Sequence, residues 1–205
     1  MRTGVAGSEA LAQLRELVAA EGGELAGTLV EEPTGEAFGP LVAAAERCHE
    51  HAAGYALLVE SILEGYLVHY QRPRLVEPPD ENLRLLAGDY LYALGLSRLA
   101  AIGDLPAVGQ LAEVIGLCSQ AHAGAEPPSS DTPEAIWVLG ALGVATGSWD
   151  EGEAAKRALR EERPEAASGA LEAAFRRAAD LGIERDVQRA LIAFRASVLS
   201  EPSGT

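Results

Sequence analysis

The chain has few of the residues from which metal centres, disulfides and nucleic-acid surfaces are built. Its only cysteines are Cys48 and Cys118, with no CxxC pair and no histidine at ligand spacing. This pattern argues against a zinc site and favours two buried free thiols. Lys and Arg number 16 against 31 Asp and Glu, which gives a net charge of −15. Because this charge repels phosphates, we expect neither nucleic acid nor an anionic membrane as a partner.

Aromatic residues and long apolar runs are also scarce. Aromatics make up 5% of the chain against 48% hydrophobic residues, so Ala and Leu dominate the apolar set and favour helices over strands. No uninterrupted apolar stretch reaches about 18 residues, the length that a membrane-spanning helix needs. Residues 1–7 lack the basic start and apolar run of a signal peptide. We therefore expect no membrane span and a cytoplasmic protein.

Apolar residues recur at helical spacing between breaks that contain Pro and Gly. In the clearest case Asp80 is placed to cap a helix whose apolar period continues to Leu99 and ends at Gly103. Ser8, Thr132 and Ser148 are expected caps of other helices, the last in a capping box with Glu151. The remaining expected helices are 40–70, as one long or two abutting helices, 106–121, 164–181 and 184–199. About eight helices predict an all-α bundle.

Three segments carry a resemblance to a known family. Residues 86–93, Leu-Ala-Gly-Asp-Tyr-Leu-Tyr-Ala, resemble the LAGDYL helix of trans-polyprenyl diphosphate synthases. Residues 34–41, Thr-Gly-Glu-Ala-Phe-Gly-Pro-Leu, follow the GGKRLRPL pattern of that family, whose cations bind a diphosphate through charge-assisted hydrogen bonds. The resemblance therefore implies degenerate diphosphate-binding positions, where the family's cations are replaced by Glu36, Ala37, Gly39 and Asp131.

The family's first aspartate-rich motif, which binds magnesium, is altered as well. Glu60 and Glu64 keep the i, i+4 spacing, but Ser61 stands in place of the middle acid. This degenerate motif supports weak magnesium binding at most, and its simpler interpretation is two carboxylates on a solvated helix face. Arg72 and Arg74 stand for the family's arginine pair, and the second aspartate-rich motif is missing. We expect no catalytic residue, no metal site and no cofactor.

The resemblance also assigns a tunnel and an interface. Tyr55 and Ala56 stand where the floor of the prenyl tunnel lies in catalytic relatives. We expect a narrow apolar cleft bordered by Tyr55, Leu58, Glu60 and Asp89, with Tyr55 closing its lower end. Because the family dimerises through the helix with the GDY sequence, the expected interface consists of Leu83, Leu86, Tyr90 and Leu94.

Taken with these replacements, the resemblance implies a truncated, isoprenoid synthase-like bundle in a single domain, residues 1–205. It would comprise an N-terminal helix region (1–32), a synthase-like core (33–146) and C-terminal helices (147–205). The implied function is that of a regulatory small subunit of a heteromeric prenyl diphosphate synthase, similar to component one of heptaprenyl diphosphate synthase, in isoprenoid and quinone side-chain biosynthesis. Its partner would be a catalytic prenyltransferase subunit, or a second copy of itself. A helical-repeat-like interaction scaffold and an enzyme of unrecognised or prenyl-type activity remain alternatives.

Overall fold

The computed structural model describes residues 6–33, 35–124 and 127–199, with only the backbone described for residues 6–8 and 199. Outside this part lies Thr34, the first residue of the pattern 34–41. Residues 1–5, which belong to the segment expected to contain no signal peptide, also lie outside it. The described chain is all-α, as predicted, and has no strand beyond one isolated bridge between Leu29 and Val76. The elements are α1 (Ala6–Glu21), α2 (Gly23–Ala26), α3 (Gly39–Ala43), the 3-10 helix η1 (Glu46–His51), α4 (Ala52–Tyr70), α5 (Glu81–Ile102), α6 (Leu105–His122), α7 (Asp131–Thr146), α8 (Asp150–Arg160), α9 (Ala166–Leu181) and α10 (Glu184–Leu199).

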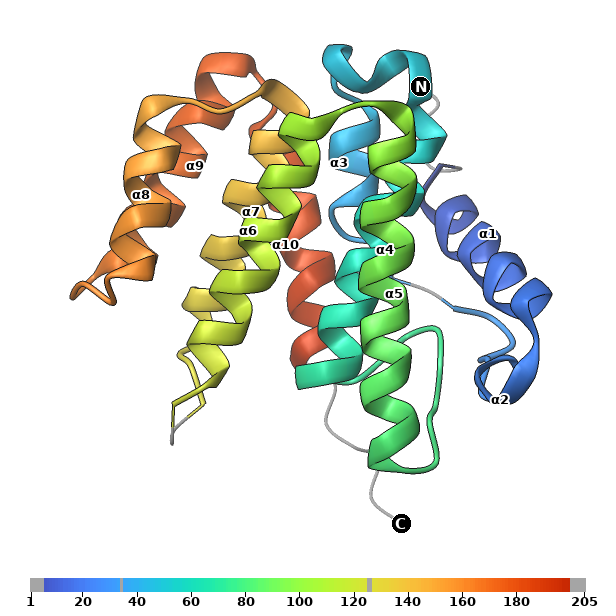
Figure 1. Ribbon diagram of the computed structural model, residues 1–205. Coiled ribbons are helices and arrows are strands. Elements are labelled where there is room, and N and C mark those ends of the chain that lie inside the picture. The colour runs from blue at the N-terminus through green and yellow to red at the C-terminus, as the bar shows by residue number, and fades with distance from the viewer. Residues whose placement is uncertain (1–5, 34, 125–126, 200–205) are drawn as a thin grey trace.

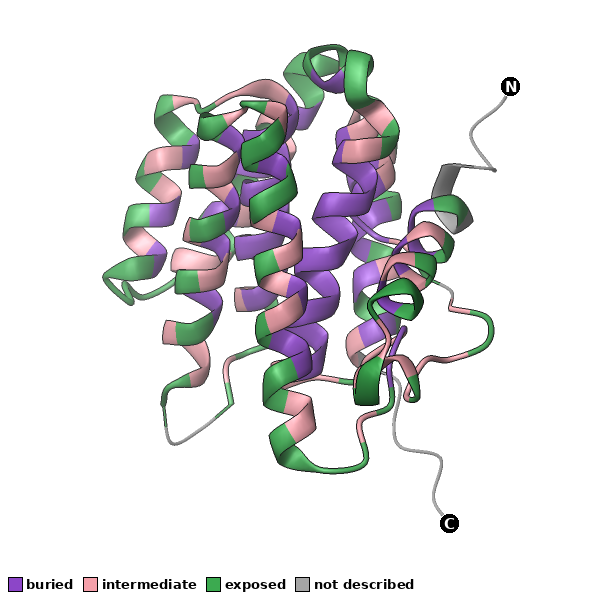
Figure 2. Cartoon of the chain, turned by 45° about the vertical axis from the view of Figure 1, so that its right-hand side comes forward, coloured by how far each residue is buried: buried purple, intermediate pink, exposed green. Residues whose placement is uncertain are grey.

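Two helices, α4 and α7, form the centre of the fold. Residues 55–68 of α4 and 133–145 of α7 are buried without interruption, as expected of helices that are apolar on all sides. In Figure 1, α8 and α9 lie at one side, α1 and α2 at the other, and α5 lies in front of α4. Figure 2 shows burial concentrated in the middle of this arrangement. The rings of Phe38 and Trp137 stack at 5.9 Å in this core, and Tyr66 meets Trp137 edge-on.

Glycines allow α4 and α5 to approach closely. A Cβ atom at Gly65 would lie 2.7 Å from Cδ1 of Tyr92 and 3.0 Å from the carbonyl oxygen of Gly88. At Gly95 it would lie 2.5 Å from Cγ1 of Ile62. These distances are shorter than real Cβ contacts, so only glycine fits there. The helix with the LAGDYL sequence is thus packed along α4 through its smallest residues.

Several predicted helix ends are confirmed. The Asp80 carboxylate accepts a hydrogen bond from the backbone N–H of Leu83 at 2.9 Å, and Gly103 adopts the left-handed conformation with φ 89°. Gly182 does the same after α9. The two thiols, Cys48 and Cys118, are buried and free, as the spacing predicted.

Other predicted helix ends are wrong. Helix α1 begins at Ala6, so Ser8 lies inside it, and α7 begins one residue before Thr132. Trp149 is the N-cap residue of α8 and forms no capping hydrogen bond, so Ser148 and Glu151 form no capping box. Neither Trp149 before α8 nor Ser130 before α7 makes a side-chain capping bond, so these two helices begin without the caps that the sequence pattern indicated.

The long apolar stretch 40–70 is divided into α3, η1 and α4 rather than one or two helices. Tertiary contacts account for the division. The Arg47 guanidinium of η1 donates to the carbonyl oxygen of Val144, near the end of α7, and to Asp104 at the start of α6. Arg47 thereby satisfies a terminal carbonyl that α7 leaves without a partner in its own helix. A continuous helix would carry Arg47 away from both acceptors.

Candidate functional site

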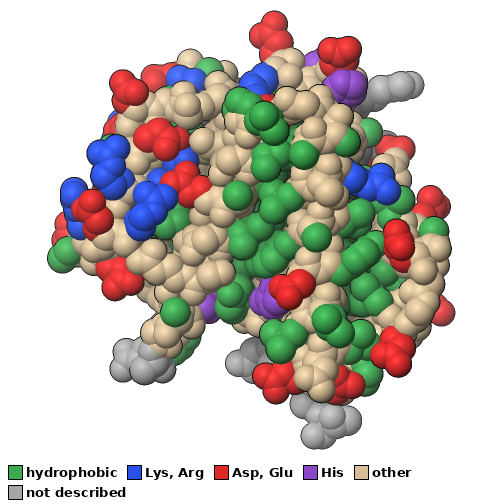
Figure 3. All heavy atoms as spheres, viewed as in Figure 1, with side chains coloured by type: hydrophobic (Ala, Val, Ile, Leu, Met, Phe, Trp, Pro, Cys, Tyr) green, Lys and Arg blue, Asp and Glu red, His purple; other side chains and the backbone are tan. Residues whose placement is uncertain are grey.

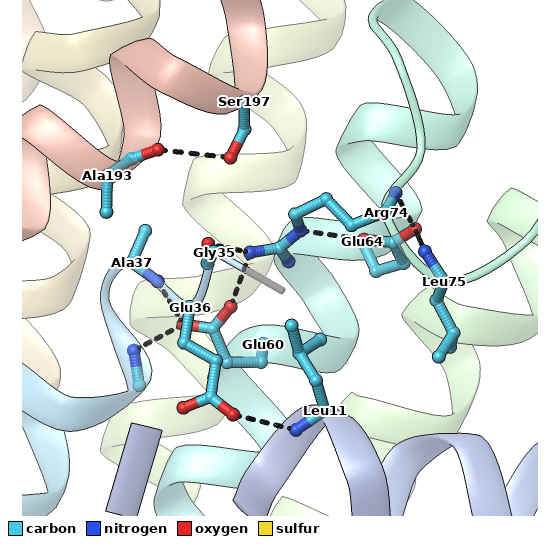
Figure 4. Close-up of polar contacts among 11 residues, drawn as sticks. Leu11, Gly35, Glu36, Ala37, Glu60, Glu64, Arg74, Leu75, Ala193 and Ser197 are labelled. Carbon is cyan, nitrogen blue, oxygen red and sulfur yellow. Dashed lines mark hydrogen bonds and ion pairs between the residues drawn. The ribbon is translucent and has the colours of Figure 1, made fainter. Parts of the chain in front are cut away.

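The candidate site lies where α4, the connector after α4 and the segment before α3 meet (Figure 4). Glu60 and Glu64 are one helical turn apart on α4, so their side chains leave the same face of the helix. That face is directed at Arg74 of the connector and at the backbone of residues 35–39. Both carboxylates are 0% exposed. The expectation of a solvated helix face was therefore wrong.

Glu64 fixes the connector by three hydrogen bonds. Its Oε1 accepts from the backbone N–H groups of Arg74 and Leu75, both at 2.7 Å, and its Oε2 accepts from Nε of Arg74 at 3.0 Å. Burying a carboxylate is costly unless it is paired and hydrogen-bonded. Here Glu64 has both an ion-pair partner, the guanidinium of Arg74, and backbone donors from the consecutive residues Arg74 and Leu75. Glu64 therefore holds the chain where it turns from α4 toward α5.

Glu60 holds the segment before α3 in the same way. Its Oε1 accepts from the backbone N–H groups of Ala37 at 2.9 Å and Gly39 at 2.7 Å, while its Oε2 accepts from Nη1 of Arg74 at 2.9 Å. A Cβ atom on Gly39 would lie 2.8 Å from Cγ of Glu60. Gly39 thus allows the close approach, and two of the predicted diphosphate-binding positions, Ala37 and Gly39, are backbone donors to Glu60.

Arg74 joins the two carboxylates into one buried network. Burial disfavours a charged guanidinium, but the charges of Glu60 and Glu64 and their hydrogen bonds outweigh this effect and raise the pKa of Arg74. Its Nη1 also donates to the carbonyl oxygen of Gly35 at 2.8 Å. The site therefore contains its own cation, which is held between the two acids that the sequence suggested for a metal.

These residues do not fit a magnesium ion. Magnesium needs oxygen ligands in near-octahedral geometry. All four carboxylate oxygens of Glu60 and Glu64 already accept hydrogen bonds from the protein, and Arg74 lies between them. Ser61 points elsewhere, because its hydroxyl donates to the carbonyl oxygen of Leu91 on α5. Among the described residues no three His, Cys, Asp or Glu side chains come together in a way that could hold a metal ion.

Glu36, the first predicted diphosphate position, is a half-buried carboxylate beside this network. Its Oε1 accepts from the backbone N–H of Leu11 on α1 at 2.9 Å, whereas its Oε2 is buried and has no hydrogen-bond partner among the described residues. Desolvation, aided by the nearby charge of Glu60, raises the pKa of Glu36 from 4.5 to about 7, although the backbone N–H groups of Leu11 and Ala10 and the charge of Arg74 act in the opposite direction. Asp131 lies elsewhere, because it lines a separate pocket with Thr132 at the start of α7.

The residues of the expected tunnel do not meet in one cleft. The Tyr55 hydroxyl donates to Oδ2 of Asp104 at 2.6 Å, and this bond, after desolvation, helps to raise the pKa of Tyr55 to about 12. Ala56 lines a pocket on the α3 side of α4, whereas Asp89 is 76% exposed on α5 and pairs with His69. Tyr55 and Ala56 are adjacent on α4 and therefore point about 100° apart around the helix, while Asp89 lies on a different helix.

The predicted interface residues lie on α5 with differing exposure. Leu86 is 65% exposed and its neighbour Leu85 is 50% exposed, while Leu83, Tyr90 and Leu94 are partly buried. In the described part of the chain, α5 is the one helix whose length and composition would allow it to cross a membrane. Only 28% of its apolar 18-residue stretch is buried. This helix packs on α4 through its glycines and leaves its other face uncovered by any described segment.

The network contains residues whose role the motif comparison missed. Leu75 was not singled out, and Arg74 was taken for one member of the family's arginine pair rather than for the cation that Glu60 and Glu64 share. A signal was present, because the two acids interrupt an otherwise apolar stretch of 14 residues, 55–68. Acids in such a stretch must be buried with a cation or with backbone donors.

Glu36 should make stability depend on pH. Because its pKa is raised above the unfolded value, its contribution is complete below pH 4.5 and is lost as the pH rises through about 7. We expect the free energy of unfolding of the wild type, relative to Glu36→Gln, to fall by about 1–2 kcal/mol between pH 4.5 and 8. This energy is smaller than the pKa shift alone would give, because solvent screens a half-exposed group. Urea unfolding of both proteins at several pH values measures this difference. A constant difference across the range would contradict the assigned environment of Glu36.

Comparison with known proteins adds no assignment to this geometry: no family model, no curated protein and no solved structure matches the chain.

Proposed function

We propose that this protein is a non-catalytic subunit of a heteromeric polyprenyl diphosphate synthase, with a truncated isoprenoid synthase-like fold and a cytoplasmic location. The observation that carries the proposal is the buried Glu60–Arg74–Glu64 network. It stands where the resemblance places the first magnesium motif of the catalytic family. The acids there support the backbone of the protein and cannot bind metal or diphosphate. A chain of this kind contributes to an assembly rather than to the chemistry.

The surface of α5 supports a role in assembly. Leu85 and Leu86 are exposed leucines next to each other on this helix, and Leu105 at the start of α6 is 67% exposed. Figure 3 shows apolar side chains gathered over α5 and between α5 and α6, while most charged side chains lie toward the edges of this view. Contiguous apolar surface of this kind marks interaction sites. We assign it to the catalytic synthase subunit, because the family forms its dimers through the corresponding helix.

The test is co-expression with a polyprenyl diphosphate synthase that has both aspartate-rich motifs, encoded in the same genome. We expect the two chains to co-purify as a heterodimer, and we expect the chain alone to show no condensation of labelled isopentenyl diphosphate in the presence of magnesium. Leu86→Asp should weaken the association at least tenfold, because a buried unpaired charge at an interface costs several kcal/mol. Light scattering and titration of the two purified chains give the stoichiometry and the Kd.

A control variant tests whether the loss of affinity is specific to α5 or follows from placing a charge at any exposed apolar position. Ile192 on α10 has the same 65% exposure as Leu86, so Ile192→Asp should leave the Kd unchanged. Turnover by the isolated chain would refute its non-catalytic role. Failure to associate with such a synthase, or equal effects of the two substitutions, would refute the proposed assembly, and a homodimer alone would exclude the heteromeric form.

A further inference from the structure

A pocket of about 410 Å³ lies between α1, α3, α4 and α10, and Glu36 is part of its lining. Eight of its lining residues are alanines, and Pro40 and Leu41 complete the apolar wall. Small side chains leave this volume open because none reaches across it. Its size lies at the lower end of the range for small-molecule sites, which are concave, mostly apolar and supplied with a few polar groups.

Besides Glu9, Gln13, Asp186 and Arg189, the polar side chains that line this pocket include the Glu36 carboxylate. Leu11 occupies its Oε1, and its Oε2 is buried without a partner among the described residues. A buried polar atom without a partner is rare in folded proteins and calls for an explanation. Figure 4 shows the carboxylate turned toward α1 and away from Arg74. Neighbouring atoms enclose Oε2, so an incoming donor reaches this unused acceptor once the Glu36 side chain shifts toward the pocket.

The charges around the pocket select the sign of the ligand. Glu9 of α1 and Asp186 of α10 lie at its edge, and the cation there, Arg189, pairs with Asp186 at 3.1 Å. Behind Glu36 lies the Arg74 network, in which one guanidinium is shared by two carboxylates, Glu60 and Glu64. The lining thus presents Glu36 and Glu9 without a cationic partner among the described residues. An anionic head group would be repelled, whereas an ammonium group would be attracted.

We propose that this pocket binds a small aliphatic amine, whose hydrocarbon part packs on the alanine wall and whose ammonium group donates a hydrogen bond to Oε2 of Glu36. A charge-assisted bond of this kind is about twice as strong as a neutral one. The raised pKa of Glu36, which desolvation causes and the charge of Glu60 increases, agrees with an acid that has no cation in direct contact. This site is independent of the proposed assembly, because it lies among α1, α3, α4 and α10 and does not use α5.

Three probes with the same six-carbon chain test the assignment: n-hexylamine, hexan-1-ol and hexanoate. Binding is measured by calorimetry and by amide chemical shifts in 0.15 M salt, where weak surface attraction is screened. We expect hexylamine to bind at least tenfold more tightly than hexanol and hexanoate not to bind. Its shifts should centre on the alanines of the pocket. From pH 6 to pH 8 its affinity should rise about tenfold, because Glu36 becomes ionised with a pKa of about 7 while the amine stays protonated.

Two substitutions and one control complete the experiment. Glu36→Gln keeps the shape and removes the charge, so hexylamine should lose at least tenfold in affinity and most of its pH dependence. Ala56→Leu fills the pocket and should abolish binding of both hexylamine and hexanol. Asp180→Asn removes an exposed acid on α9 outside the pocket and should change the affinity by no more than about threefold. Equal binding of amine and alcohol, or an undiminished affinity in folded Glu36→Gln, would overturn the proposal.

Discussion

Replacing Arg74 with methionine is expected to destabilise the protein by about 3–5 kcal/mol at pH 7, a large part of the stability of a domain of this size. The substitution keeps most of the side-chain volume and removes the cation between Glu60 and Glu64. Two fully buried carboxylates would then face each other without a counter-ion. Urea unfolding followed by circular dichroism measures the loss.

The cause of the loss can be checked by pH and by a control. Protonation removes the buried negative charge, so the deficit of Arg74→Met should shrink as the pH falls from 7 toward 4.5. Arg163 also pairs with a glutamate, Glu161, but the two side chains are 60% and 47% exposed. Exposed pairs contribute at most about 1 kcal/mol, so Arg163→Met should have little effect. A deficit that is independent of pH would show that packing, and not charge, dominates at Arg74.

Changing Gly65 to alanine is expected to lower the stability by about 1–3 kcal/mol, although alanine is the better helix former. The added methyl group would lie 2.7 Å from the Tyr92 ring and 3.0 Å from the backbone oxygen of Gly88. To accommodate it, α5 must move away from α4, and overpacking of this kind costs more than the gain in helix propensity. Thermal and urea unfolding of the variant measure the change.

The same substitution at Gly116 provides a matched control. Gly116 also lies in the middle of a helix, α6, but a Cβ atom there meets nothing within 4 Å. Gly116→Ala should therefore raise the stability by about 0.5–1 kcal/mol, because alanine loses less backbone entropy on folding. If the change from glycine to alanine lowers the stability at Gly65 and raises it at Gly116, Gly65 is required for the close packing of α4 and α5. Destabilisation at both positions would contradict this account.

The candidate site shows how far sequence patterns reach. The i, i+4 spacing of Glu60 and Glu64 correctly placed two acids on one helix face, since that follows from the period of the helix alone. Whether this face meets solvent, a metal or a cation depends on the connector that follows α4. Arg74 reaches the two acids because the chain turns back after Tyr70. Spacing along the chain contains no information about that return.

The sequence by itself determined where most of the longer helices lie, because apolar periodicity, the Asp80 cap and the left-handed glycines act over a few residues. It determined the fold class for the same reason, since a chain rich in Ala and Leu and poor in aromatics forms helices wherever its period allows. Only the tertiary structure decided where α3, η1 and α4 separate, that Glu60 and Glu64 share Arg74 as their cation, and that Oε2 of Glu36 is left without a hydrogen-bond partner. These features depend on burial and on contacts between distant segments, whose free energies arise when the helices pack.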